Sequence, residues 1–139
     1  MKIELAKTDA DILKCRDVMR ELRPHIGADE FLLRVKEAVS EGYQLAFIEE
    51  NGKAVAAIGY RYLNFLFCGK HFYIDDLSTL PEARGKGYGG ELLDFVATLA
   101  KEKGFDVITL DSGHHRNTAH RLYLNKGFVI SSHHFTKKL

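Results

Sequence analysis

The stretch Arg84-Gly85-Lys86-Gly87-Tyr88-Gly89-Gly90 stands between a predicted strand and a predicted helix, where an antiparallel pattern gives way to a helical crossover. Four of its seven residues are glycine, which lets the backbone come close to a ligand. A helix leaves its first amide groups without partners and carries partial positive charge at that end. With Arg84 and Lys86 adding charge, the stretch has the features of a diphosphate-binding loop.

On its own, the same pattern also fits an ordinary glycine-rich turn. It is not a Walker A motif, because no Gly-Lys-Ser/Thr sequence follows. It is a poor dinucleotide-binding fingerprint, because the preceding strand belongs to a meander and no acidic ribose partner stands at the expected place. The choice between a turn and a phosphate site therefore depends on the rest of the chain.

Residues before this stretch predict a meander of three antiparallel strands. Residues 43–48 form the first strand, and Asn51-Gly52 is a strong signal for a two-residue hairpin turn. Residues 54–66 form the second strand, which is unusually long and has Gly59 as a candidate β-bulge. Residues 71–80 form the third strand, which leads into the glycine-rich stretch. A short strand at 3–5 and two helices at about 9–22 and 29–41 precede the meander.

Residues after the stretch predict a crossover and a closing helix and strand. An amphipathic helix ending at Gly104 is followed by an apolar strand at 105–110, which implies a right-handed crossover and a parallel strand pair. A helix at 117–126 and a last strand at 128–135 complete the chain. The predicted order is β-α-α-β-β-β-α-β-α-β, an α+β fold with a mixed, mostly antiparallel sheet of six to seven strands and helices on both faces.

The composition sets outer limits on function. The 139 residues suit a single domain that spans residues 1–139. With 20 basic and 19 acidic residues, the chain lacks the basic excess of a dedicated nucleic-acid binder. No run approaches the roughly 20 apolar residues that span a bilayer, and the charged N-terminus does not resemble a signal peptide, so we expect a cytoplasmic protein. Neither the cysteines nor the histidines show zinc-ligand spacing, and no metal is expected.

A second segment makes the interpretation specific. Residues 117–128 read Asn-Thr-Ala-His-Arg-Leu-Tyr-Leu-Asn-Lys-Gly-Phe. Together with Arg84, Gly87 and Gly89, this segment resembles the two signature motifs of the GNAT acetyltransferases, in the same order along the chain. The resemblance extends to the whole strand order, and it implies the acyl-CoA N-acyltransferase fold. The sequence departs from the family at its end, because only eleven residues follow Phe128, so the usual final hairpin is short or absent.

The resemblance implies that the chain binds acetyl-CoA as a co-substrate. In the family, main-chain amides of the glycine-rich loop bind the coenzyme A pyrophosphate. The strand before the loop pairs with the pantetheine arm. Carried over to this sequence, the cofactor-binding residues are Leu77, Ser78, Thr79, Arg84, Gly85, Lys86, Gly87, Tyr88, Gly89, Gly90, Asn117 and Tyr123.

By the same resemblance, Tyr123 is catalytic, as the general acid that returns a proton to the departing coenzyme A thiolate. A phenol with a pKa near 10 is able to protonate a thiolate. The other interpretation of Tyr123 is a core tyrosine packed on the sheet. For Asn117, the alternatives are a contact with the cofactor or an ordered water, and a plain helix N-cap.

Asp75 and Asp76 are the candidate general bases, on the strand that leads to the loop, where some members of the family carry an acidic pair. Adjacent residues of a strand face opposite sides, so only one of the two faces the cleft. Asp75 is favoured because it shares strand parity with Leu77 and Thr79, an argument that a bulge would overturn. The alternative is a pair of solvated or salt-bridged carboxylates. Asp111, at the end of the neighbouring strand, is a third candidate.

The predicted function is transfer of the acetyl group of acetyl-CoA to a primary amine of a small molecule or protein by direct attack. The alternative is a non-catalytic acyl-CoA-binding or regulatory module, since a fold can lose its chemistry and keep its ligand. A third reading is a plain interaction protein. The acceptor pocket is expected from residues 20–35, and no nucleic-acid or membrane partner is expected. The acceptor and the oligomeric state stay open, with a homodimer as the commonest assembly.

Overall fold

One mixed sheet of five strands forms the centre of the protein, and its spatial order β1-β2-β3-β4-β5 follows the chain. The computed structural model describes residues 2–139. The first four strands are antiparallel and β5 runs parallel to β4, so the sheet contains the predicted meander and the predicted parallel pair. The strands are β1 (Ile3–Leu5), β2 (Tyr43–Glu50), β3 (Lys53–Phe65), β4 (Gly69–Thr79) and β5 (Ile108–Leu110).

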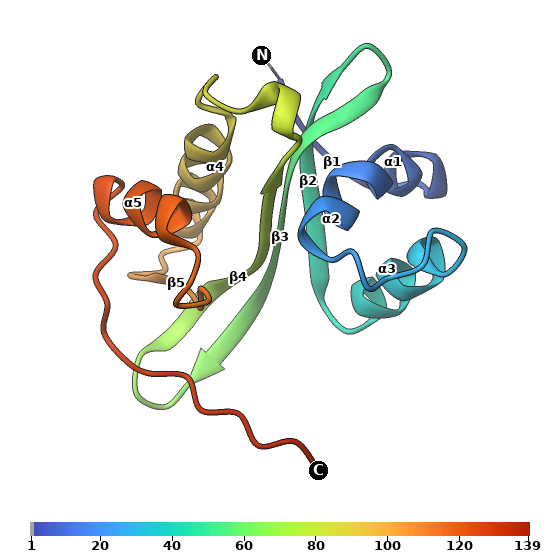
Figure 1. Cartoon of the computed structure of the whole chain (residues 1–139). Helices are drawn as coiled ribbons and strands as arrows, with labels where there is room; N and C mark the ends of the chain where they lie inside the picture. The colour runs from blue at the N-terminus through green and yellow to red at the C-terminus, as the bar shows by residue number, and fades with distance from the viewer. Residues whose placement is uncertain (1) are drawn as a thin grey trace.

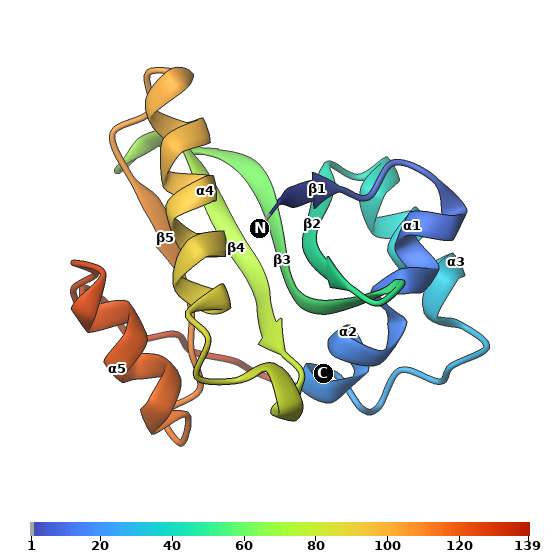
Figure 2. The ribbon, with the colours of Figure 1, turned by 90° about the horizontal axis from the view of Figure 1, so that it is seen from above.

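Helices cover both faces of this sheet, as Figures 1 and 2 show. A short 3-10 turn at Pro81–Ala83 connects β4 to the loop that precedes the longest helix. One face carries α1 (Asp9–Lys14), α2 (Arg16–Leu22) and α3 (Phe31–Ser40), and the other carries α4 (Tyr88–Glu102) and α5 (Asn117–Asn125).

The central strands are apolar on both sides because both sides are covered. Residues 54–58 of β3 are all buried, without the alternation of a strand that has one face in water. Val18 of α2 packs into the core from one side, and Leu92 and Val96 of α4 pack into it from the other. Packing on both faces of the sheet therefore positions α2 and α4 on either side of β4, the strand that leads to the glycine-rich loop.

The first predicted helix, residues 9–22, is divided in two at Cys15. The Cys15 amide bonds to the carbonyl of Ile12 at 3.0 Å, three residues back, so the helix tightens at this point. The Cys15 side chain is fully buried in the core. The prediction of one continuous helix is therefore wrong, because packing of Cys15 redirects the chain into α2.

The predicted last strand, residues 128–135, does not form, and within residues 2–139 the sheet has five strands rather than six to seven. Phe128 donates its amide to the Tyr123 carbonyl at 3.0 Å, which closes the end of α5. Beyond it, Ile130 is 78% exposed and Phe135 is 91% exposed. Figure 1 shows this segment, in red, leading away from the sheet. Strand propensity alone does not form a strand when no sheet edge pairs with it.

A β-bulge interrupts the pairing of β3 with β4. Gly59 pairs with Asp76 and Tyr60 pairs with Ile74, so Asp75 has no residue opposite it. This confirms the bulge predicted at Gly59 and places its extra residue on β4.

Tyr43 of β2 holds the bulge from the neighbouring strand. Its ring lies over Gly59, where a Cβ atom would overlap the tyrosine Oη and ring. The Tyr43 hydroxyl donates a hydrogen bond to Asp76 Oδ2 at 2.8 Å. Glycine is therefore required at position 59 for close approach rather than for an unusual φ angle.

Beyond the bulge, β4 and β5 no longer pair. β5 pairs with Phe72, Tyr73 and Ile74, and residues 75–79 of β4 have no partner on that side within residues 2–139. The strand predicted at 105–110 is correspondingly shortened to Ile108–Leu110. The Asp75 carbonyl accepts a hydrogen bond from Arg23 Nη2 at 3.0 Å. The N–H and C=O groups that β4 directs to this side beyond Asp75 are available to a ligand.

Replacing Gly59 by alanine tests how the bulge is held. Because the new methyl group would overlap the Tyr43 side chain, we expect Gly59→Ala to lower the free energy of unfolding by about 2 kcal/mol, the usual scale for overpacking. Urea unfolding measures this change. In a Tyr43→Ala background there is no ring to displace, so the same substitution should cost much less there. An equal cost in both backgrounds would contradict this account.

Candidate active site

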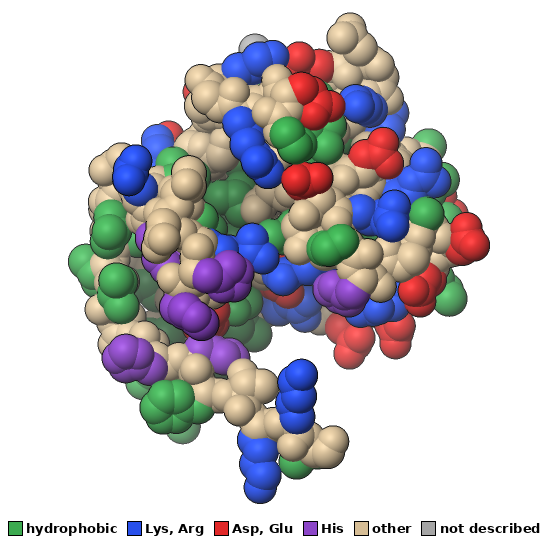
Figure 3. Space-filling view, viewed as in Figure 1, with side chains coloured by type: hydrophobic (Ala, Val, Ile, Leu, Met, Phe, Trp, Pro, Cys, Tyr) green, Lys and Arg blue, Asp and Glu red, His purple; other side chains and the backbone are tan. Residues whose placement is uncertain are grey.

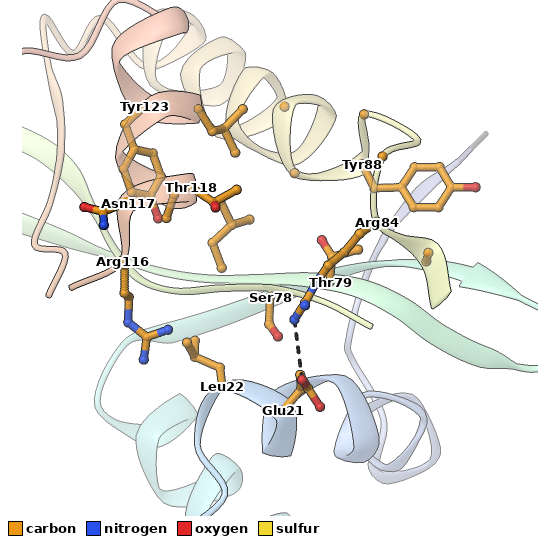
Figure 4. Close-up of a pocket in the computed structure, with 18 of the residues that line it drawn as sticks. Glu21, Leu22, Ser78, Thr79, Arg84, Tyr88, Arg116, Asn117, Thr118 and Tyr123 are labelled. Atoms are coloured by element: carbon orange, nitrogen blue, oxygen red, sulfur yellow. Dashed lines mark hydrogen bonds and ion pairs between the residues drawn. The ribbon is translucent and has the colours of Figure 1, made fainter. Parts of the chain in front are cut away.

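A cavity of about 660 Å³ lies beside the unpaired part of β4. Its walls come from the end of α2, from β4, from the loop and first turn of α4, and from the start of α5. Figure 4 shows these segments around one space. The predicted site residues that line it are Leu77, Ser78, Thr79, Arg84, Gly85, Gly87, Tyr88, Gly89, Gly90, Asn117 and Tyr123.

The loop before α4 presents unpaired main-chain amides to this cavity. Gly87 occupies the N-cap position of α4 at φ +83°, a left-handed conformation that glycine adopts without strain. The first hydrogen bond of the helix runs from the Glu91 amide to the Gly87 carbonyl at 3.1 Å. The amides of Tyr88, Gly89 and Gly90 therefore have no partner inside the helix. The dipole of this 15-residue helix adds partial positive charge at the same end, and the geometry suits a diphosphate.

Close packing joins this loop to α5. A Cβ atom at Gly89 would lie 3.2 Å from Leu122 Cδ2. A Cβ atom at Gly90 would lie 2.9 Å from Lys126 Cε, at the end of α5. Lys126 Nζ also bonds to Asp94 Oδ2 of α4 at 2.8 Å. The two glycines thus let the start of α4 lie close to Leu122 and Lys126, at the C-terminal end of α5.

Among the charged side chains of the loop, only Arg84 turns toward the cavity. Lys86 does not line it, and Lys86 Nζ lies 3.6 Å from Glu50 Oε2 of β2. The Tyr88 hydroxyl also donates to Glu50, and Figure 4 shows the Tyr88 ring directed away from the cavity. Arg84 Nη2 lies 3.4 Å from Glu21 Oε1 of α2, as the dashed line in Figure 4 marks.

Asp75 and Asp76 lie outside the cavity lining, and each is held by an arginine. Arg61 binds Asp75 from Nε at 3.0 Å and from Nη2 at 2.7 Å. Arg23 donates from Nε to Asp76 Oδ1 at 2.9 Å, while Tyr43 holds Oδ2. The salt-bridged alternative is therefore the arrangement in the structure. The bulge also removes the strand-parity argument that favoured Asp75.

Two phenols donate to carboxylates at β4, Tyr43 to Asp76 of that strand and Tyr73 of that strand to Asp111. Burial, together with the charge of Asp76, raises the pKa of Tyr43 well above its usual value. Burial and the hydrogen bond to Asp111 raise the pKa of Tyr73, whose hydroxyl donates to Asp111 Oδ2 at 2.7 Å. Both phenols are therefore protonated donors at neutral pH. Asp111, the third candidate base, is engaged in this bond and does not line the cavity.

Tyr123 lines the cavity from α5. Its ring packs edge-on against Phe128, with 5.8 Å between the ring centroids. Burial raises the pKa of Tyr123, and the positive charge of Arg116 acts in the opposite direction. Because the raised pKa lies above 10, the phenol carries its proton at neutral pH. The two interpretations of Tyr123 are compatible, since the ring packs on the core while the residue lines the cavity.

Asn117 is the first residue of α5, and it lines the cavity. Arg116 takes the N-cap position, without a side-chain hydrogen bond to the helix. The interpretation of Asn117 as the N-cap is therefore wrong. Figure 4 shows its side chain on the same side of the cavity as the Tyr123 ring.

The lining contains further residues that the sequence does not single out. Arg116 and Thr118 flank Asn117, so their place beside the motif at residues 117–128 could have marked them as site residues. Glu21 and Leu22 fall in the segment expected for the acceptor pocket, but no local pattern marks them, since they reach the site only through the packing of α2 on β4. The residues concerned are Glu21, Leu22, His115, Arg116 and Thr118.

In the part of the chain that the structure describes, we find neither a membrane-spanning helix nor a cluster of metal-ligating side chains. No helix in residues 2–139 is long and apolar enough to cross a bilayer. Within the same residues, no group of three or more His, Cys, Asp or Glu side chains is placed to hold a metal ion. Cys15 is buried and Cys68 is half-buried, and both are free thiols.

Known proteins resemble this chain in sequence and in fold. A model of the acetyltransferase (GNAT) family matches residues 12–128. The uncharacterized N-acetyltransferase YhdJ of Bacillus subtilis is 37% identical over 122 residues, which cover 86% of each chain. The aminoalkylphosphonate N-acetyltransferase of Salmonella typhimurium is 36% identical over 66 residues, which cover 48% of this chain and 43% of that one. An aminoglycoside N-acetyltransferase solved in complex with CoA superimposes with a TM-score of 0.83 at 14% identity, covering 99% of this chain and 95% of that one.

The matched region includes every segment that lines the cavity, from the end of α2 to Tyr123. It also includes both motifs on which the resemblance rests. The structural match agrees with the predicted acyltransferase fold, apart from the missing last strand. This chain therefore belongs to the GNAT family of acetyltransferases.

Proposed function

We propose that this protein transfers the acetyl group of acetyl-CoA to a primary amine of a small molecule or protein, by direct attack of the amine on the thioester. The observation that carries this proposal is one cavity that joins the unpaired amides at the start of α4 to Tyr123 on α5. Such amides suit a diphosphate, and a phenol beside the same space suits a leaving thiolate. Family membership and the CoA complex of a protein with the same fold support coenzyme A as the carrier.

The residues present fit coenzyme A in three respects. The amides of Tyr88, Gly89 and Gly90 would hold the diphosphate, with Arg84 adding charge. The unpaired edge of β4 at residues 75–79 would pair with the amide groups of the pantetheine arm, as an added strand does. A cavity of about 660 Å³ lies within the usual range for small-molecule and cofactor sites.

The protein's own groups then have distinct tasks. The thioester supplies an acyl carbon activated for attack, at which the new C–N bond forms as the C–S bond breaks. Main-chain N–H groups in residues 77–79 would stabilise the charge on the carbonyl oxygen. Tyr123 would give its proton to the leaving sulfur, because burial keeps the phenol protonated until that step.

Glu21 is our candidate for the group that takes the amine's proton, through intervening water, because it lies toward the Arg84 end of the cavity. It is the single carboxylate among the lining residues of the described chain. Its partner is Arg84, which the diphosphate would attract, so cofactor binding would release the carboxylate. Asp75 and Asp76 have their oxygens occupied by arginines and Tyr43. We therefore assign them to holding the bulge.

Release of free thiol from acetyl-CoA in the presence of a panel of primary amines tests the proposed function. Amine-dependent thiol release supports it. A thermal-shift titration with acetyl-CoA is measured in parallel, because a bound ligand raises the melting temperature. Binding without thiol release for any amine would favour a non-catalytic acyl-CoA-binding module. No binding at all would reject both functions.

Tyr123→Phe removes the proposed acid and keeps the ring that packs on Phe128. We expect kcat to fall about 100-fold, the lower range for loss of a general acid, with acetyl-CoA affinity and melting temperature unchanged. In the parent enzyme, the acid form is lost only as pH rises through the raised pKa of Tyr123, above about 10. Unchanged kcat in the variant at pH 7 would exclude this role.

Gly87→Ala tests the loop as the diphosphate site. A side chain at φ +83° is strained by about 1–2 kcal/mol, so we expect the loop to shift. A loss of about 1.4 kcal/mol in binding free energy would lower acetyl-CoA affinity about 10-fold. Gly104→Ala is the matched control, because Gly104 also has a positive φ, +77°, at the far end of α4. Calorimetric titration should show weaker binding only for Gly87→Ala. Equal affinities in the two variants would argue against the loop as the binding site.

Glu21→Gln tests the proposed base. At pH values below the pKa of the acceptor amine, we expect kcat/KM for that amine to fall at least about 100-fold. At high pH, where the free amine needs no base, kcat/KM should recover. Asp111→Asn is the comparison, since Asp111 bonds to Tyr73 outside the cavity. A pH–rate profile for Glu21→Gln parallel to that of the parent enzyme would remove Glu21 from the mechanism.

A further inference from the structure

Arg116 occupies a place in the cavity that the proposed chemistry does not use. It lines the cavity from the N-cap position of α5. Within residues 2–139, no ion pair and no side-chain hydrogen bond engages its guanidinium, which leaves a fixed cation free to bind a ligand. Nearby arginines differ in this respect, since Arg84 pairs with Glu21, Arg61 with Asp75, and Arg23 with Asp76.

The position of Arg116 corresponds to the acceptor side of the cavity. Figure 4 shows its side chain extending from the start of α5 toward Leu22, at the opposite end of the cavity from Arg84. Its charge is also close enough to Tyr123 to influence the phenol. In the proposed function, the diphosphate lies at the Arg84 end and the thioester lies beside Tyr123. A group bound at Arg116 is therefore beyond the thioester, where the acceptor enters.

The charges that line the cavity favour an anion at this end. Glu21 is the one acidic residue among the lining residues that the structure describes, against Arg84 and Arg116. Glu21 faces Arg84 rather than Arg116. Figure 3 shows Lys and Arg side chains near the hollow at the centre of this face, with Asp and Glu side chains beside them. A polycationic acceptor would be repelled here, whereas an acidic group would meet an unpaired guanidinium.

We propose that the acceptor is a small primary amine that also carries a carboxylate or a phosphonate, and that Arg116 binds this acidic group. A guanidinium presents its donors in a planar fork that matches either group through two parallel hydrogen bonds. Binding at Arg116 leaves the amine of the same molecule directed back toward the thioester beside Tyr123. This inference rests on the proposed function, because an acceptor site has a role only if acetyl transfer occurs.

The competing role for Arg116 is electrostatic stabilisation of the leaving thiolate. In that role, its removal lowers kcat for every acceptor alike. As the binding site of an acidic group, its removal raises KM for acid-bearing amines and leaves amines without the acid unchanged. The two roles are therefore separated by how KM and kcat change across matched acceptors.

The experiment measures thiol release from acetyl-CoA with matched acceptors: α- and β-amino acids, their amides, and aminoalkylphosphonates. We expect kcat/KM for the acid-bearing amines to exceed that for the amides by at least about 10-fold. Arg116→Ala should raise KM for the acids about 10- to 100-fold, as loss of a charge-assisted pair does. Arg116→Lys should restore part of the effect as a point charge. Arg121→Ala is the control, since Arg121 is an exposed residue of the same helix outside the cavity lining.

The outcomes distinguish this inference from the function on which it rests. Equal turnover of acids and amides, or faster turnover of polyamines, would overturn the inference and leave acetyl transfer intact. So would a fall in kcat for all acceptors in Arg116→Ala. Preference for carboxylates or for phosphonates identifies which acid the site takes. Absence of thiol release with every amine, together with no thermal shift by acetyl-CoA, would overturn the proposed function itself.

Discussion

The register shift between β3 and β4 is the constraint on which the site depends. At the shift, Asp75 has no residue opposite it, and two arginines and Tyr43 hold the local carboxylates. Just beyond it, β4 stops pairing with β5 and passes into the loop before α4. If the pairing continued, β5 would cover the edge of β4 that now borders the cavity. The ion pairs at the bulge therefore affect the site without lining it, because they stabilise the path of β4 beside the cavity.

Much of the fold is predictable from local sequence, for physical reasons. The turn at Asn51-Gly52 and the bulge at Gly59 mark the meander, because each position requires a residue that tolerates a special backbone or a close neighbour. The amphipathic pattern of α4 and the glycines before it locate the loop. The motif at residues 117–128 locates α5. These signals are short-range, and together they are sufficient to predict the family.

Other parts of the structure depend on contacts that local sequence does not encode. Residues 128–135 have the composition of a strand, but no sheet edge in the described part of the chain pairs with them. Asp75 stands at the expected distance from the loop, but Arg61, from the adjacent strand, takes both of its oxygens. Glu21 and Arg116 reach the cavity from opposite faces of the sheet, and only the packing of α2 and α5 shows that they share one space.

The tight fit of Gly89 and Gly90 against α5 has a consequence for how such proteins diverge. The loop that would hold the donor and the helix that carries Tyr123 approach each other closely, since a Cβ atom at Gly89 would lie 3.2 Å from Leu122 Cδ2 and one at Gly90 would lie 2.9 Å from Lys126 Cε. A larger residue at Gly89 therefore requires Leu122 to shift or to be smaller, whereas one at Gly90 requires the flexible end of the Lys126 side chain to move aside. These positions are expected to co-vary among relatives, and a chimera that joins the loop of one relative to the last helix of another would inherit the mismatch.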